Sequence, residues 1–137
     1  DKFMNFFKKQ IKRKEWKIKR NCLNLIFECA KESHPNEFGG FLRVDDTLKD
    51  IITEIVMLPG TISGETHAIF KMHMMPVDFS IVGTVHSHPG PSSNPSQADL
   101  QLFRKHGKIH IISAMPYNTS SWNAYNQKGE RIEIKVV

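Results

Sequence analysis

The segment that most constrains the fold of this chain is a run of largely apolar and β-branched residues at 79–88, which ends at Pro89. β-Branched residues favour extended structure, and proline lacks the main-chain N–H that a strand inside a sheet must donate. We therefore expect Phe79–His88 to form a central, buried strand. His86 and His88 stand at its end, two positions apart, so they project from the same face of the strand.

The remainder of the sequence predicts further strands and two helices around this one. Apolar periodicity predicts helices over residues 21–33, with Asn21 as the N-cap, and over about 97–106. Further strands are predicted over residues 15–20, 41–44, 50–58, 67–73, 108–114, 121–126 and 131–137. A length of 137 residues suits one compact core, and the sequence has no internal repeat. We expect a single α/β domain over residues 16–137, preceded by a basic extension at 1–15.

The formal net charge of +5, from 19 Lys and Arg against 14 Asp and Glu, arises largely at the N-terminus. Residues 1–15 hold six basic and two acidic side chains, whereas residues 16–137 hold thirteen basic and twelve acidic ones. The main domain is therefore close to neutral, and we do not expect nucleic acid to be its partner.

The basic extension also carries a short apolar stripe. Phe3, Phe7 and Ile11 recur at four-residue spacing among lysines, which predicts a short amphipathic helix or an irregular arm. Three interpretations stay open: a solvated extension, a contact for an acidic or nucleic-acid partner, and self-association with a second copy of the chain.

The cysteines and the hydropathy indicate the compartment. Cys22 and Cys29 are seven residues apart in a predicted helix, about 10 Å along its axis, which is too far for a disulfide within that helix. Reduced thiols are typical of the cytoplasm. No segment approaches the roughly 20 consecutive apolar residues of a membrane span, and no signal-peptide pattern stands near the start. We expect a cytoplasmic protein with no membrane partner.

The histidine pair is a candidate metal site. In a chain with seven histidines, a pair at this spacing arises by chance about one time in three, so its context has to carry the interpretation. At the end of a rigid apolar strand, His86 and His88 can converge on one ion at the Zn–N distance of about 2.0–2.1 Å. The alternative, two histidines hydrogen-bonded to the main chain at a strand end, stays open.

Asp99 follows His88 by eleven residues and Ser96 by three. Ser-x-x-Asp before an apolar helical run is typical of a capping box, in which Ser96 caps the helix and Asp99 lies in its first turn. The first turn of a helix can also hold a metal ligand rigidly. Two imidazoles and one carboxylate would leave a tetrahedral zinc one open position, as catalytic zinc sites have.

Glu37 is the candidate base that such a site needs to deprotonate water. Gly39 and Gly40 follow it, directly before the short strand predicted over residues 41–44, and glycines at a strand indicate a close approach of main chain or ligand. A solvated loop residue is the alternative for Glu37.

Together these residues resemble the signature of the JAMM (MPN+) metalloprotease family. That signature has Glu with Gly at +3 and Leu at +5, then H-x-H-P, then Ser and Asp eight and eleven residues after the second His. The matching residues are Glu37, Gly40, Leu42, His86, Ser87, His88, Pro89, Ser96 and Asp99. The resemblance covers about residues 16–137 and is closest to the compact stand-alone archaeal members.

The resemblance implies a cytidine-deaminase-like α/β fold, a mixed curved β-sheet flanked by helices, with one catalytic zinc ion per chain. It implies His86, His88 and Asp99 as zinc ligands. It further implies Glu37 as the catalytic base and Ser96 as the hydrogen-bond donor to the oxyanion. A true deaminase would carry H-x-E and P-C-x-x-C motifs, and the sequence has neither.

The substrate that the family implies is a peptide or isopeptide bond after the C-terminal tail of a ubiquitin-like small modifier, as in deubiquitinases. The alternative is a non-catalytic MPN-type scaffold that binds modifiers or partner proteins. Scaffold members of the family usually lack ligands, so the complete set of Glu, two His and Asp favours the enzyme.

Overall fold

The computed structural model describes residues 2–5, 15–57 and 78–137. Residues 2–5 are helical, and 71% of the Phe3 surface is exposed. The rest of the predicted N-terminal stripe, Phe7 and Ile11, lies outside the described residues. So does the strand predicted over residues 67–73.

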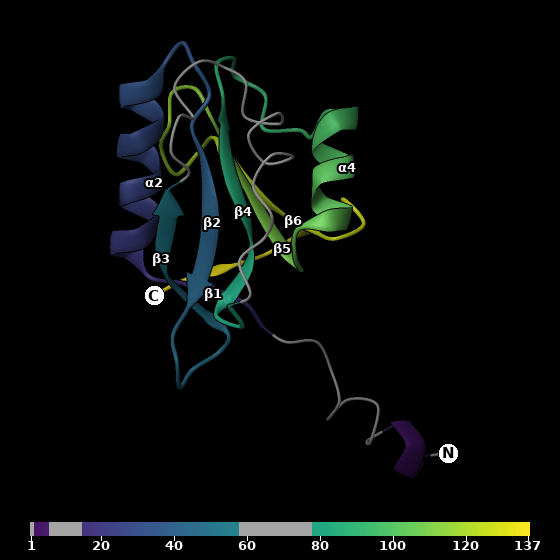
Figure 1. The fold of residues 1–137 in the computed structure, drawn as a ribbon. Helices are drawn as coiled ribbons and strands as arrows, with labels where there is room; N and C mark the ends of the chain where they lie inside the picture. Colours follow the sequence, from purple (N-terminus) through teal and green to yellow (C-terminus); the bar gives the residue numbers. More distant parts are fainter. Residues whose placement is uncertain (1, 6–14, 58–77) are drawn as a thin grey trace.

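Within the described residues, eight strands form one mixed sheet in the order β7-β6-β5-β4-β2-β3-β1-β8, most of which is labelled in Figure 1. The strands are β1 (Lys17–Ile18), β2 (Gly39–Val44), β3 (Ile51–Met57), β4 (Ile81–His88), β5 (Ile109–Ala114), β6 (Trp122–Asn126), β7 (Arg131–Ile132) and β8 (Lys135–Val136). The predicted central strand is β4, which pairs antiparallel with β2 and parallel with β5. It begins two residues later than predicted, because Phe79 lies in a turn in which Asp78 accepts hydrogen bonds from Ser80.

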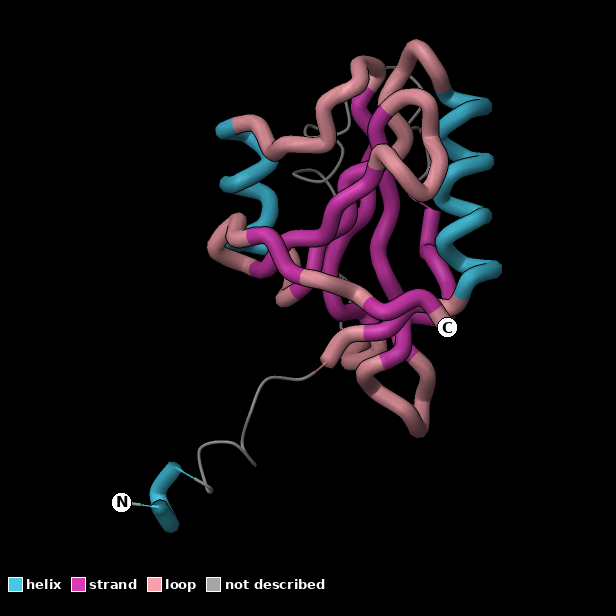
Figure 2. The backbone as a smooth tube through the Cα atoms, turned by 180° about the vertical axis from the view of Figure 1, so that it is seen from behind, coloured by secondary structure: helices cyan, strands magenta, loops and turns pink. Residues whose placement is uncertain are grey.

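The two outermost strands of the sheet are consecutive in the sequence. β7 pairs with β6 at one edge and β8 pairs with β1 at the other, although only Glu133 and Ile134 separate them. The sheet therefore has to curl until its edges approach each other, and Figure 2 shows the C-terminal segment crossing between them. The single strand predicted over residues 131–137 was wrong, because one straight strand cannot pair with both edges.

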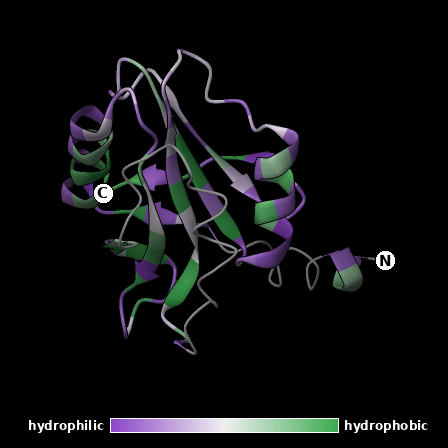
Figure 3. Cartoon of the chain, turned by 45° about the horizontal axis from the view of Figure 1, so that its top comes forward, coloured by the Kyte–Doolittle hydropathy of each residue, from purple (hydrophilic) through white to green (hydrophobic). Residues whose placement is uncertain are grey.

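Two helices, α2 (Arg20–Ser33) and α4 (Gln97–Lys105), cover opposite faces of the sheet (Figure 1). Successive residues of a strand point to opposite faces, so Leu42 packs with the α2 core and its neighbour Phe41 with the α4 core. Figure 3 shows hydrophobic strands between helices whose outer faces are hydrophilic. No helix in the described ranges has the length and apolar character that crossing a bilayer requires.

The start of α2 differs from the prediction. Lys19, and not Asn21, is the N-cap, and no side chain caps the helix. The reason is tertiary: β1 leads directly into α2, and the N–H of Arg20 donates to the carbonyl of Val137 at 2.9 Å. Main chain from the other end of the domain thus satisfies a donor that a cap side chain would otherwise serve.

The glycines of the central strands leave room for neighbouring strands. A Cβ added at Gly40 would lie 2.8 Å from the carbonyl oxygen of Val56 in β3. A Cβ at Gly83 would overlap the carbonyl of Ile109 in β5. The close approach expected beside Glu37 is therefore an approach of main chain.

Candidate metal centre

The structure brings the two histidines of β4 together with Asp99 of α4. The Nε2 atoms of His86 and His88 are 3.3 Å apart. The carboxylate of Asp99 spans both rings, with Oδ1 3.0 Å from Nε2 of His86 and Oδ2 3.0 Å from Nε2 of His88. His86 and Asp99 are fully buried, whereas the side chain of His88 keeps 18% of its surface exposed. The cluster is thus closed on the inside and open at His88.

Asp99 also completes the capping box of α4. Its main-chain N–H donates to Oγ of Ser96 at 3.1 Å, and its Oδ2 accepts from the N–H of Ser96 at 2.9 Å. The capping-box interpretation of Ser-x-x-Asp is therefore confirmed, and the same carboxylate also faces both imidazoles, as the metal-ligand prediction requires. The capping box fixes the orientation of the Asp99 carboxylate relative to α4.

The hydroxyl group of Ser96 can still donate its hydrogen in a hydrogen bond. Its oxygen accepts from the Asp99 N–H, while its single hydrogen has no role in the cap. Ser96 is exposed, so that hydrogen can be directed to a bound molecule.

His88 is held by the loop that joins β4 to α4. Its Nδ1 lies 2.9 Å from the carbonyl oxygen of Ser92. A carbonyl only accepts, so Nδ1 carries the hydrogen and the neutral ring keeps its lone pair on Nε2. Burial alone would lower the pKa of His88, but hydrogen bonds with Asp99 and with the Ser92 carbonyl outweigh it and raise that pKa.

The same loop is anchored to β6. Asn123 donates to Oγ of Ser93 at 2.6 Å, and the hydroxyl of Tyr125 donates to the Ser93 carbonyl at 2.7 Å. Hydrogen bonds from β6 therefore fix the loop between His88 and Asp99 to the sheet.

Glu37 lies on the loop between α2 and β2, and it is half-buried. Ligand atoms of Glu37, His86 and His88 all lie within 4.8 Å of one another. Strand pairing brings Glu37 close to the histidines, because Gly39, two residues after Glu37, pairs with His86 at the start of the β2–β4 ladder. Glu37 is therefore part of the histidine cluster and not an isolated loop residue.

The donor set fits a zinc ion. Ligand atoms about 2.1 Å from a tetrahedrally coordinated zinc lie about 3.4 Å from one another. The observed separations are 3.3 Å between the two Nε2 atoms and 3.0 Å from each of them to Asp99, close to that spacing. Neutral imidazole nitrogens and a carboxylate are also the ligand types that zinc takes in catalytic sites.

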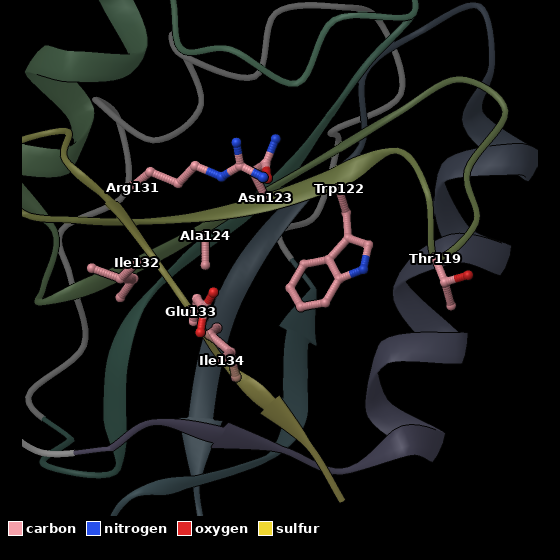
Figure 4. A pocket seen from close by; sticks show the side chains of 8 residues that line it. All are labelled: Thr119, Trp122, Asn123, Ala124, Arg131, Ile132, Glu133 and Ile134. Atoms are coloured by element: carbon pink, nitrogen blue, oxygen red, sulfur yellow. The ribbon is translucent and has the colours of Figure 1, made fainter.

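A cavity of about 630 Å³ lies elsewhere, between β6 and the segment that leads from β7 to β8 (Figure 4). Its lining consists of Thr119, Trp122, Asn123, Ala124, Arg131, Ile132, Glu133 and Ile134. None of the five predicted site residues lines it.

Of the other histidines in the described ranges, none joins the cluster. His106 is the C-cap of α4, and His110 is buried beneath that helix. His34 bonds through Nδ1 to the hydroxyl of Tyr117 at 2.9 Å. His67 and His73 lie outside the described residues.

Tyr117 and Ser87 contact the site, and the sequence predicted a role in it for neither of them. The hydroxyl of Tyr117 donates to the carbonyl of His88 at 2.9 Å, and Oγ of Ser87 accepts from the N–H of Phe38 at 2.9 Å. No local pattern identifies Tyr117, which contacts residues far from it in the sequence. For Ser87, its place between the two histidines was the available signal.

Comparisons with known proteins agree with this geometry. Residues 19–125 match the family described as prokaryotic homologs of the JAB domain. A protein of Haloferax volcanii named "Probable metalloprotease" is 35% identical over 127 residues, which are 88% of this chain and 78% of that protein.

Two solved structures are similar along most of the chain. A JAB1/MPN domain protein from Archaeoglobus fulgidus is 38% identical with a TM-score of 0.72, covering 91% of this chain and 99% of that one. A structure described as JAMM, a metalloprotease-like zinc site in the proteasome and signalosome, is 41% identical with a TM-score of 0.70. That match covers 90% of this chain and 98% of the other.

These findings confirm the resemblance seen in the sequence and the expected α/β fold, a single domain with a curved mixed sheet and flanking helices. The zinc-site neighbour and the group of Glu37, His86 and His88 together indicate zinc as the metal.

Proposed function

The chain belongs to the prokaryotic homologues of the JAB domain, and on that basis we propose that it is a zinc-dependent hydrolase acting on ubiquitin-like small modifier proteins. It would cleave peptide or isopeptide bonds after the C-terminal tail of the modifier. The observation that carries this proposal is the convergence of Glu37, His86 and His88 within 4.8 Å. The relative named as a probable metalloprotease supports the same reaction class.

Three side chains hold the metal in this proposal, with one zinc ion per chain. His86 and His88 bind through Nε2, and Asp99 binds through its carboxylate. Three protein ligands leave one position open, which distinguishes a catalytic zinc site from a structural one with four. The capping box keeps the buried carboxylate of Asp99 oriented whether or not the metal is bound.

A bound zinc ion supplies Lewis acidity, which brings the pKa of water to about 7 and polarises a carbonyl group. Glu37 accepts the proton of the attacking water and later passes it to the leaving amine, acting first as base and then as acid. Ser96 donates its free hydroxyl hydrogen to the oxyanion that develops on the carbonyl oxygen. His88 stays correctly oriented because its Nδ1–H is held by the Ser92 carbonyl.

The substrate class rests on the family resemblance and on the open position of the site beside His88. A cytoplasmic location accompanies it, supported by Cys22 and Cys29, which are both free thiols.

Metal content and cleavage test the proposal together. Zinc is measured by elemental analysis, and cleavage is assayed on a panel of ubiquitin-like fusions for wild type, Glu37→Ala and His88→Ala. We expect about one zinc per wild-type chain, retained in Glu37→Ala, much reduced in His88→Ala, and both variants inactive.

Two matched substitutions control for surface effects. Glu28→Ala removes an exposed carboxylate that pairs with Lys31, and His106→Ala removes a histidine of the α4 C-cap. Both should cleave like wild type. Wild-type protein without zinc, or cleavage insensitive to a chelator, would show that the chain is not a zinc hydrolase and would favour the scaffold alternative.

We also propose that residues 1–15 form an extension that the hydrolase domain does not need. The exposure of Phe3 supports a role in self-association. A protein of residues 16–137 should keep its zinc and its activity, and lose any concentration-dependent dimer that light scattering detects in the full chain. Loss of zinc on truncation would place the boundary elsewhere.

A further inference from the structure

The proposed base and the proposed metal ligands come from different segments, so something must set the distance between them. Glu37 lies on the loop at 34–38, while His86 and His88 lie on β4. The β2–β4 ladder begins only at Gly39, after Glu37. Main-chain pairing therefore brings the loop near the site without including Glu37 itself.

Ser87 ties the end of this loop to β4. Its side chain points to the face opposite the two histidines, where its Oγ accepts from the N–H of Phe38 at 2.9 Å. Its own N–H donates to the carbonyl of Phe38 at 3.0 Å. Both polar main-chain groups of the residue that follows Glu37 are thus bound by the residue between the two histidines.

Tyr117 ties the start of the loop to the same strand. Its hydroxyl donates its only hydrogen to the carbonyl of His88 at 2.9 Å, so the contact at 2.9 Å with Nδ1 of His34 must be donated by the histidine. Burial, and then the charge of Glu37, raise the pKa of Tyr117, which keeps the hydroxyl protonated as a donor.

The backbone of Tyr117 is unusual for its residue type. Its φ is 62°, in the left-handed region that side chains other than Asn and Gly seldom adopt, and its ring is 4% exposed. Such a conformation costs on the order of 1–3 kcal/mol and persists only where the surroundings hold it. The ring is held in the α2 core, which aims the hydroxyl between His34 and His88.

We propose that Ser87 and Tyr117 are positioning residues that hold Glu37 against the histidine pair by tying both ends of the 34–38 loop to β4. This inference rests on the proposed function, because it assigns a consequence for catalysis. A base that moves by about 1 Å loses on the order of 100-fold in rate without any change in the residues that react.

The test uses Ser87→Ala and Tyr117→Phe, with Ser113→Ala as the matched control. Ser113 pairs with Ser87 across the β4–β5 ladder and is equally buried, but within the described part of the chain its hydroxyl has no hydrogen-bond partner. Tyr117→Phe keeps the ring and removes only the hydroxyl. It also serves as the second variant if Ser87→Ala, which leaves the Phe38 N–H unsatisfied, folds poorly.

We expect kcat on the best fusion substrate to fall about 10- to 100-fold in both variants, with KM and the zinc Kd within about threefold of wild type. Glu37→Gln removes the proposed base and leaves only a residual rate of cleavage. In that background the same substitutions should change the residual rate less than about twofold, since their effect acts through Glu37. Ser113→Ala should keep wild-type kcat.

Amide hydrogen exchange gives a readout that needs neither metal nor activity. In metal-free protein, the amides of residues 36–38 should exchange at least about tenfold faster in both variants, with β5 amides unchanged. Unchanged exchange at 36–38, or a kcat loss that persists in the Glu37→Gln background, would overturn the positioning role. If wild type cleaves nothing and binds no zinc, the proposed function fails, and the exchange result still reports separately whether the ties exist.

Discussion

In the described part of the chain, the histidines beneath α4 fall into a structural group, which is the buried His110 alone, and a candidate metal-site group, the buried His86 and the half-buried His88. The two groups differ in what their ring nitrogens contact. In the structural group, Nδ1 of His110 lies 2.7 Å from the hydroxyl of Thr84 and Nε2 lies 3.1 Å from the Gly107 carbonyl. The ring stacks on Phe103 with centroids 4.4 Å apart. Both nitrogens are thus used by neutral partners.

In the metal-site group, Nε2 of His88 faces Nε2 of His86 and a buried carboxylate. The consequence appears in the pKa values. Burial lowers the pKa of His110 to about 3, whereas the hydrogen bonds to Asp99 and Ser92 raise the pKa of His88 despite its burial. The comparison shows that burial does not make a histidine a ligand candidate, and that a convergent lone pair with a charged partner does.

The two groups should differ most in how their substitution affects stabilisation of the fold by zinc. At free zinc 100-fold above Kd, we expect the free energy of unfolding of wild type to rise by about 2.7 kcal/mol. His110→Gln should show the same increase from its own baseline, and His88→Ala should show none. Urea unfolding with and without zinc measures this. Equal zinc stabilisation of His88→Ala and wild type would remove the distinction between the groups.

Asp99 allows its two roles to be separated. Asp99→Asn keeps an oxygen that can accept from the Ser96 N–H but removes the charge that faces both histidines. We expect zinc affinity to fall at least about 100-fold, with the helix cap largely retained. Asp99→Ala should lose both, at a further cost of about 1 kcal/mol in stability. Isothermal titration and urea unfolding distinguish the variants, and unchanged affinity in Asp99→Asn would contradict its role as a ligand.

Ser96 offers a similar separation at smaller scale. Ser96→Ala should lower kcat by about 10²–10³ through loss of the oxyanion donor, with zinc content unchanged. It should also cost about 1 kcal/mol through loss of the cap. Ser96→Thr retains a hydroxyl for both roles, so kcat within about tenfold of wild type is the matched result. A normal kcat in Ser96→Ala would exclude the donor role.

A pH effect concerns the structural group, His110. The pKa of His110 is about 6.5 in the unfolded chain and about 3 in the folded chain. Between these two pH values the unfolded chain carries a proton on His110 and the folded chain does not. The unfolded state holds more protons in that window, so the stability contributed by neutral His110 is lost as pH falls, by up to about 1.4 kcal/mol per pH unit.

His110→Gln has no such titration. The stability difference between wild type and this variant, followed by urea unfolding of metal-free protein from pH 7 to 4, should therefore shrink as pH falls. A constant difference would mean that His110 becomes protonated in the folded protein at ordinary pH.

Much of the site could be predicted because its residues belong to local sequence patterns. The β-branched run predicted β4, its two-residue period placed both histidines on one face, and Ser96 with Asp99 predicted the start of α4. Such patterns depend on neighbours within about one turn or one pleat, which the sequence lists directly.

The differences lie where distant segments meet. Residues 131–137 split between two edges because the sheet curls, and α2 needs no cap side chain because Val137 serves its first donor. Tyr117 reaches His34 across 83 positions, and no periodicity extends that far.

The sequence by itself determined the chemistry of this protein: which nitrogens and oxygens are available, and on which rigid elements they stand. Only the tertiary structure decided how they are held: the main chain of Phe38 is bonded to Ser87, and the hydroxyl of Tyr117 links His34 to the end of β4. The physical reason is that hydrogen-bond direction and burial depend on three-dimensional neighbours, whereas strand and cap preferences depend on the residues alongside.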